Sequence, residues 1–256
     1  MVWLTAAGWS CTGGVSEESR VRSQADVNLG RGLYADEHNP RAAIVAWERA
    51  ARLDPENAEA RLYLGIVFAN DLRMYDRAET ELRRAIALLE PRVATEERDR
   101  ATLAEARNTL GAVLVNVGRY DDAIRVLRQA TAEVTYTSQH LAWGNLGWAY
   151  QRKGDHPHAV EALQRAVSLQ PAFCVGFARL AQSQFDLGQH AQALQAVEHA
   201  LDPAREECTR LQLAWLIKAR IHTQLQQPEQ ASEAISRCVA LSETTDEGRA
   251  CAALRH

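Results

Sequence analysis

The most regular pattern of apolar and polar positions along the chain lies between residues 143 and 171. Apolar or small side chains recur there at helical steps of three and four, in two segments separated by the polar turn Lys153-Gly154-Asp155. These positions are Trp143, Leu146, Gly147, Tyr150, Ala159, Leu163, Ala166 and Pro171. Gly147 and Ala159 are small enough to let two helix backbones approach, and Pro171 would end the second helix. The pattern predicts a pair of packed antiparallel helices.

This unit recurs along the whole chain. Aligned on it, the small residue of each first helix falls at Gly30, Gly65, Gly111, Gly147, Ala181 and Ala219. The steps between these positions are 35, 46, 36, 34 and 38 residues. A period near 34 with these residue types is typical of tetratricopeptide repeats.

The repeats predict an all-α fold. We expect a right-handed superhelical solenoid of six helix-turn-helix repeats over residues 23–243, with a C-terminal capping helix within 244–256. The 46-residue step predicts extended, solvent-facing helices around residues 86–107, where charges of both signs alternate. We detect no pattern typical of a strand.

In a tetratricopeptide solenoid the first helix of each repeat lines a concave groove. Its groove-facing positions flank the small residue at fixed offsets. For partner binding they predict Asn108, Val115, Leu141, Asn145, Trp148, Gln151, Arg179, Gln182 and Phe185. Asn108 and Asn145 fall on adjacent repeats, where side-chain amides are suited to bonding the backbone of an extended peptide.

Trp148 is the most distinctive of these residues, because the repeat pattern asks for no aromatic side chain there. Together with Val115, Leu141 and Phe185 it would form an apolar patch in the groove, of the kind that marks partner sites. The alternative is that Trp148 packs against a neighbouring helix or a covering N-terminal segment.

The sequence favours no catalytic or metal-dependent chemistry. We find no phosphate-binding glycine loop and no pairing of a nucleophile with a base. The proline of His156-Pro157-His158 prevents a helical pair of metal ligands. With a net charge of −4, the chain has no broad basic field for nucleic acid. We therefore expect no enzyme activity, cofactor, metal or small-molecule substrate.

The N-terminus and the cysteines bear on the compartment. Residues 1–10 are apolar and uncharged, and they end at Cys11 before a polar run up to residue 22. Segment 1–22 is thus interpreted as a signal remnant and tether; the alternative is a leader without function. Four more cysteines lie in the last third of the chain, Cys174, Cys208, Cys238 and Cys251. An even, clustered set suits disulfides, and the alternative is buried free thiols.

Several stretches resemble the type IV pilus pilotins of the PilF/PilW/Tgl type. They are Gly118–Ala123 (GRYDDA), Tyr136-Thr137, Trp143–Tyr150 (WGNLGWAY), Arg152–Asp155 (RKGD) and Ala166–Pro171 (AVSLQP). The spacer Tyr136-Thr137 and the run Trp143–Trp148 favour this family over other repeat proteins. The six repeats behind an N-terminal cysteine are also similar to that family.

The resemblance implies a lipoprotein on the periplasmic face of the outer membrane that binds pilus secretin subunits and promotes their localisation and multimerisation. Cys11 matches the lipidated cysteine, although Gly8, Trp9 and Ser10 depart from the usual lipidation motif. With Cys11 so assigned, we hypothesise that Cys174 pairs with Cys208 and Cys238 with Cys251. The alternative function is a cytoplasmic adaptor that binds an unrelated peptide.

Overall fold

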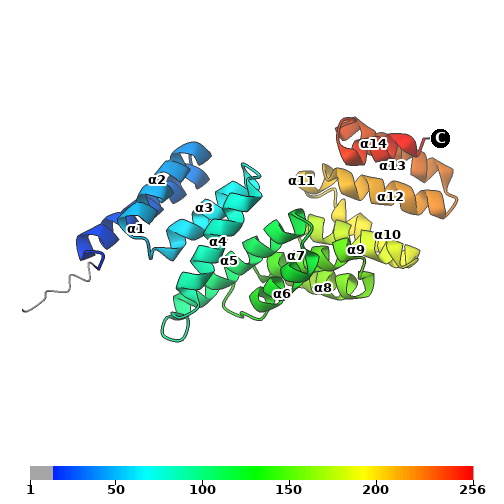
Figure 1. Cartoon of the computed structure of the whole chain (residues 1–256). Coiled ribbons are helices and arrows are strands. Elements are labelled where there is room, and N and C mark those ends of the chain that lie inside the picture. Colours follow the sequence, from blue (N-terminus) through cyan, green and yellow to red (C-terminus); the bar gives the residue numbers. More distant parts are fainter. Residues whose placement is uncertain (1–13, 256) are drawn as a thin grey trace, which may run out of the picture.

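The computed structural model describes residues 14–255, which form fourteen helices arranged as successive antiparallel hairpins (Figure 1). The predicted leader and Cys11 lie outside the described residues. The six hairpins are α1 (Glu17–Ala35) with α2 (Pro40–Leu53), α3 (Ala58–Asn70) with α4 (Tyr75–Leu89), α5 (Glu97–Asn116) with α6 (Tyr120–Thr131), α7 (Gln139–Lys153) with α8 (His156–Leu169), α9 (Cys174–Asp186) with α10 (His190–Ala200), and α12 (Gln212–Gln224) with α13 (Pro228–Leu241). The short α11 (Glu206–Thr209) precedes the sixth hairpin, and α14 (Asp246–Ala253) follows it.

This architecture confirms the predicted all-α array of six repeats with a terminal helix. The first hairpin begins at Glu17, upstream of the predicted boundary at residue 23. The terminal helix α14 packs against both helices of the last hairpin, α12 and α13. It therefore covers apolar surface that would otherwise end the array exposed.

The small residues lie where the two helices of each hairpin touch. A methyl group added to Gly147 would overlap the side chain of Leu163 on the partner helix. The same relation holds for Gly30 with Trp47, Gly65 with Leu82 and Gly111 with Leu127. In these four hairpins the first helix thus seats a large buried side chain of the second helix directly against its backbone.

The turns inside the hairpins use two kinds of residue. Gly118, Gly154 and Gly188 take left-handed backbone conformations with φ between 73° and 86°. In the first, second and sixth hairpins this conformation falls on His38, Arg73 and Gln226, with φ between 51° and 55°. Residues with a Cβ are disfavoured there, so these three turns carry backbone strain that the other three avoid.

The curvature of the array follows from which helices meet between repeats. First helices contact the next first helix, as α3 does α5, α5 does α7, α7 does α9, and α9 does α12. Second helices pack mainly on the first helix that follows, as α6 does on α7. The first helices of successive repeats therefore contact one another and form the inner row of the array.

The extra residues between the second and third repeats are arranged differently from the prediction of extended, solvent-facing helices. Helix α4 ends at Leu89, residues 90–96 form a connecting segment, and only α5 is lengthened, to 20 residues. Its charges are not all solvent-facing, because Asp99 is buried and pairs with Arg92 at 2.8 Å. Arg107 pairs with Glu90 at 2.9 Å across the same connection.

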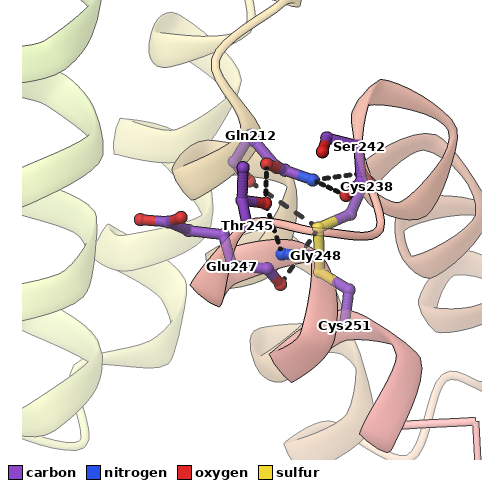
Figure 2. Close-up of a disulfide and its surroundings, with 7 residues drawn as sticks. All are labelled: Gln212, Cys238, Ser242, Thr245, Glu247, Gly248 and Cys251. Atoms are coloured by element: carbon purple, nitrogen blue, oxygen red, sulfur yellow. Dashed lines mark hydrogen bonds between the residues drawn. A yellow bond between two sulfur atoms is a disulfide. The ribbon is translucent and has the colours of Figure 1, made fainter.

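The terminal helix α14 is held by a disulfide and a hydrogen-bonded glutamine (Figure 2). Cys238 of α13 joins Cys251 of α14, with their Cα atoms 6.3 Å apart. Gln212 Nε2 donates to the carbonyls of Cys238 at 2.7 Å and Ser242 at 2.6 Å. Its Oε1 accepts from Thr245 Oγ1 at 2.6 Å, and Thr245 caps α14. The last repeat and its cap are thereby joined at several points.

The second disulfide joins Cys174, at the start of α9, to Cys208, with a Cα–Cα distance of 5.5 Å. Cys208 lies in the short helix α11, before the first helix of the sixth repeat, and it is fully buried. Both pairs in the structure are those hypothesised from the sequence. Their oxidation in solution stays a prediction.

Candidate protein-binding face

The predicted binding residues fall on three adjacent inner helices. Asn108 and Val115 lie on α5, while Leu141, Asn145, Trp148 and Gln151 lie on α7; Arg179, Gln182 and Phe185 lie on α9. These helices belong to repeats three, four and five, and they contact one another in that order. We call the surface of α5, α7 and α9 on this side the inner face.

Two predicted groove residues are buried. Val115 is 0% exposed within the core, and Asn108 is 6% exposed. The prediction that they line an open groove is therefore wrong. Neighbouring first helices touch directly, so side chains on the flank that faces the next repeat are covered by it.

Asn108 takes part in a hydrogen-bonded chain across the repeats. Asn145 Nδ2 donates to Asn108 Oδ1 at 2.9 Å, and Asn108 Nδ2 donates to the hydroxyl of Tyr136 at 3.3 Å. Burial, reinforced by the charge of Glu105, raises the pKa of Tyr136 to about 12, so its hydroxyl stays protonated. Asn108 is therefore engaged inside the protein, and the expectation that it bonds a peptide backbone is also wrong.

Sequence reasoning missed the part played by Tyr136. It was noted only as part of a spacer typical of the resembling family. Tyr136 is buried against Ala104, Ala130 and Ala142, so the segment between α6 and α7 packs into the array. A large aromatic residue in the short connection between α6 and α7 was the available signal.

Trp148 is half-buried, and one side of its ring faces the next repeat. The guanidinium carbon of Arg179 on α9 lies 4.3 Å from the centre of the Trp148 ring. Such a separation gives a favourable cation–π contact. Trp148 thus packs against a neighbouring helix, as the alternative interpretation held, while it remains partly exposed on the inner face.

The Arg179 guanidinium has no acceptor for its N–H groups among residues 14–255, by either a hydrogen bond or an ion pair. Burial lowers the pKa of Arg179 to about 10, which still leaves the side chain charged at neutral pH. Its backbone carbonyl accepts a bond of 3.1 Å from Gln151 Nε2, which also donates to Ser183 Oγ at 2.9 Å. Gln151 therefore braces α7 against α9.

The remaining predicted residues differ in exposure. Leu141 is 38% exposed, and Phe185 is half-buried with its ring centre 5.4 Å from that of His190. Gln182 Nε2 donates to Asp186 Oδ1 at 2.8 Å on the same helix. Of the four residues predicted to form the apolar patch, Trp148, Phe185 and Leu141 are therefore at least partly exposed, whereas Val115 is buried.

The inner face also carries an acidic side chain that sequence reasoning did not single out. Burial raises the pKa of the Glu105 carboxyl on α5, and the positive charge of Arg31 opposes this only in part. Among the described residues Glu105 has no ion-pair partner within 4 Å. Glu105 of repeat three is thus an acidic residue, and Arg179 of repeat five a basic residue, without an ion-pair partner among residues 14–255.

Other features of the described chain lie away from this face or offer no site. A cavity of about 650 Å³ opens beside α13 and the C-terminus, bordered by Gln227, Ile235 and Leu254 among others. Between residues 14 and 255, no three His, Cys, Asp or Glu side chains are placed to hold a metal ion. None of the described helices combines the length and apolar character needed to span a bilayer.

Comparison with known families supports the repeat assignment. Three family profiles, each described as tetratricopeptide repeat, match residues 27–94, 102–172 and 213–245. Together these matches take in most of the array.

Two curated proteins are similar in sequence. The type IV pilus assembly protein PilF of Pseudomonas aeruginosa is 27% identical over 164 residues, which cover 61% of this chain and 58% of PilF. The secreted RxLR effector protein RXLR-C07 of Plasmopara halstedii is 36% identical over 110 residues, covering 36% of this chain and 34% of that protein. The chain therefore aligns with only 34% and 58% of the lengths of these relatives.

Two solved structures resemble the whole array. That of Pseudomonas aeruginosa PilF has a TM-score of 0.71 at 20% identity, covering 93% of this chain and 99% of that chain. That of PilW, described as a widely conserved type IV pilus biogenesis factor, has a TM-score of 0.70 at 22% identity, covering 91% and 98%. At these identities the likeness shows a shared fold.

Proposed function

The chain belongs to the tetratricopeptide-repeat family and is related to the pilus assembly protein PilF, and from this we propose that it is a non-catalytic scaffold for assembly of the type IV pilus. In this proposal it binds secretin subunits and promotes their localisation to the outer membrane and their multimerisation. The relationship to PilF over 61% of the chain is the observation that carries the proposal. A fold shared with PilF and PilW over more than nine-tenths of the chain is consistent with it.

The inner face supplies the proposed contact surface. Trp148, Phe185 and Leu141 offer partly exposed apolar area on consecutive repeats, next to the charged Arg179. Partly exposed tryptophan and arginine are favoured anchors in protein interfaces. No catalytic step is needed for such a role.

The proposed location is the periplasmic face of the outer membrane, with an acyl anchor on Cys11. Two cysteine pairs placed for disulfides support an oxidising compartment. Incorporation of labelled palmitate that is lost in Cys11→Ser would support the anchor. A protein recovered in the cytoplasm with four free thiols would favour the alternative, an adaptor for an unrelated peptide.

The function is tested in the source cell by deleting the gene and following the secretin. We expect fewer heat-stable secretin multimers in the outer-membrane fraction and co-purification of secretin with the tagged wild-type protein. Trp148→Ala should weaken this capture. The matched control is Leu169→Ala, which removes an exposed apolar side chain from α8 of the outer row. Unchanged secretin multimers after deletion would contradict the proposal.

A further inference from the structure

The pairing of Arg179 with Trp148 points to a specific kind of partner segment. Resting on the proposed scaffold function, we propose that these two side chains form a subsite for a carboxylate. The carboxylate belongs to an Asp or Glu side chain in an extended segment of the bound protein. The subsite lies on the inner face between repeats four and five, where α7 meets α9.

The hydrogen-bonding state of Arg179 is the first observation. Two other arginines with little exposed side chain have acidic partners: Arg61, 14% exposed, pairs with Glu81 at 2.9 Å, and Arg107, 19% exposed, pairs with Glu90 at 2.9 Å. Arg179 has no such partner among residues 14–255. Its N–H donors are therefore left for a ligand.

The energetic argument follows from dehydration. Burial of the guanidinium lowers the pKa of Arg179, which means that the protein environment disfavours its charge relative to water. The indole of Trp148 offsets this over one face of the guanidinium, 4.3 Å away. The N–H groups along the edge of the guanidinium remain without an anionic partner among residues 14–255. A carboxylate fits that edge through two parallel charge-assisted bonds, which are stronger than neutral ones.

The subsite is held in place before a ligand arrives. Gln151 on α7 bonds both the backbone carbonyl of Arg179 and the Ser183 hydroxyl on α9. Ser183 Oγ in turn donates to the Arg179 carbonyl at 3.1 Å. These bonds fix the two helices that carry Trp148 and Arg179. Ordering of the site therefore adds little to the free-energy cost of binding a ligand.

The position in the array indicates a side-chain carboxylate within a longer segment. Repeats lie on both sides of the subsite, so an extended segment can continue along the inner row in either direction. Glu105 on α5, which interacts electrostatically with Arg31 of α1 and Tyr63 of α3, would repel an acidic residue placed near it. We therefore expect the acidic residue to occupy one fixed position, with no acidic neighbour on the side that runs over α5.

To test this, the purified wild-type protein is used to select binders from a phage library that displays random dodecapeptides. Peptides that bind should share an Asp or Glu at one position. Synthetic copies are then measured by fluorescence polarisation, each beside a copy in which that Asp or Glu is the corresponding amide. The amide copy should bind the wild type about tenfold or more weakly. With Arg179→Gln, the acid and amide copies should bind alike to within about twofold.

Two further variants separate the subsite from general effects of charge and folding. Arg165→Gln removes an arginine that lies over Trp143, 5.3 Å from the ring centre, and it should leave the preference for acid unchanged. Arg179→Lys keeps the charge without the planar fork and should retain only part of the preference. Thermal melting confirms that each variant is folded.

The outcomes separate this inference from the proposed function. Selection without a shared acidic position, or a preference for acid that survives in Arg179→Gln, overturns the subsite. Loss of secretin capture by the wild type with the peptide preference intact would instead remove the secretin as partner and leave the subsite standing.

Discussion

Asn145 on α7 donates a hydrogen bond of 2.9 Å from its side-chain amide to Oδ1 of Asn108 on α5. Two polar residues that the repeat pattern assigns to a ligand thus bond each other. The link joins the inner helices of repeats three and four, and Tyr136 extends it to the connection before α7. The link therefore holds two helices of the inner row and the connection between repeats three and four to one another.

Replacing the buried member of this pair should be costly. Asn108→Ala leaves the amide of Asn145 and the hydroxyl of Tyr136 without their partner, and we expect a loss of about 1–3 kcal/mol in the free energy of unfolding. Urea denaturation followed by circular dichroism measures it. Asn116→Ala, which removes an exposed side chain bonded only within α5, should change stability by less than about 0.5 kcal/mol. Equal effects of the two changes would contradict the importance of the link.

Glycine-to-alanine changes at two helical positions should have opposite signs. A methyl group on Gly147 would overlap Leu163, so Gly147→Ala should destabilise the protein by about 1–3 kcal/mol. On Gly32 in α1 a methyl group would meet only Asp36 Oδ2, at 3.8 Å, so Gly32→Ala should stabilise by about 0.5–1 kcal/mol. Thermal melts of both variants decide this. A tolerated alanine at residue 147 would argue against close approach of α7 and α8.

The inner-face carboxylate gives a pH-dependent prediction. Burial raises the pKa of Glu105 in the folded protein above its unfolded value. Its charged form therefore disfavours folding, and stability is lost as the pH rises through the folded pKa. Glu105→Gln should be more stable than the wild type at pH 7, and the difference should shrink as the pH falls below the ordinary pKa of glutamate.

The difference is measured by urea denaturation of both proteins at each pH, so that other titrating groups cancel. Glu161→Gln, at an exposed position on α8, is the matched control and should show no such trend. A Glu105→Gln variant less stable than the wild type at pH 7 would mean that the carboxylate has a stabilising partner.

In an oxidising compartment both disulfides should form, and removing each should destabilise the protein. The bridges close loops with sequence separations of 34 and 13 residues, and loss of either should cost about 2–4 kcal/mol. Mass spectrometry of unreduced peptides gives the pairing, and urea denaturation of the paired Cys→Ser variants gives the cost. Free thiols at all four positions would remove this prediction.

The sequence by itself determined the fold. Gly30, Gly65, Gly111 and Gly147 recur where only a hydrogen atom fits under a partner side chain, and each pair is local in the chain. A spacing rule can therefore find the hairpins, their number and their order. The terminal helix was also predictable, because an array that ends on an apolar face requires a cover.

The tertiary structure decided which side of each inner helix stays open. The exposure of Val115, Asn108 and Trp148 depends on how closely α5, α7 and α9 approach, and that contact lies between repeats. The pairing of Arg179 with Trp148 depends on the same contact. A repeat pattern describes packing within one hairpin, where the chain is short and the geometry nearly fixed. The surface left between hairpins follows from side chains brought together across repeats, which no local spacing records.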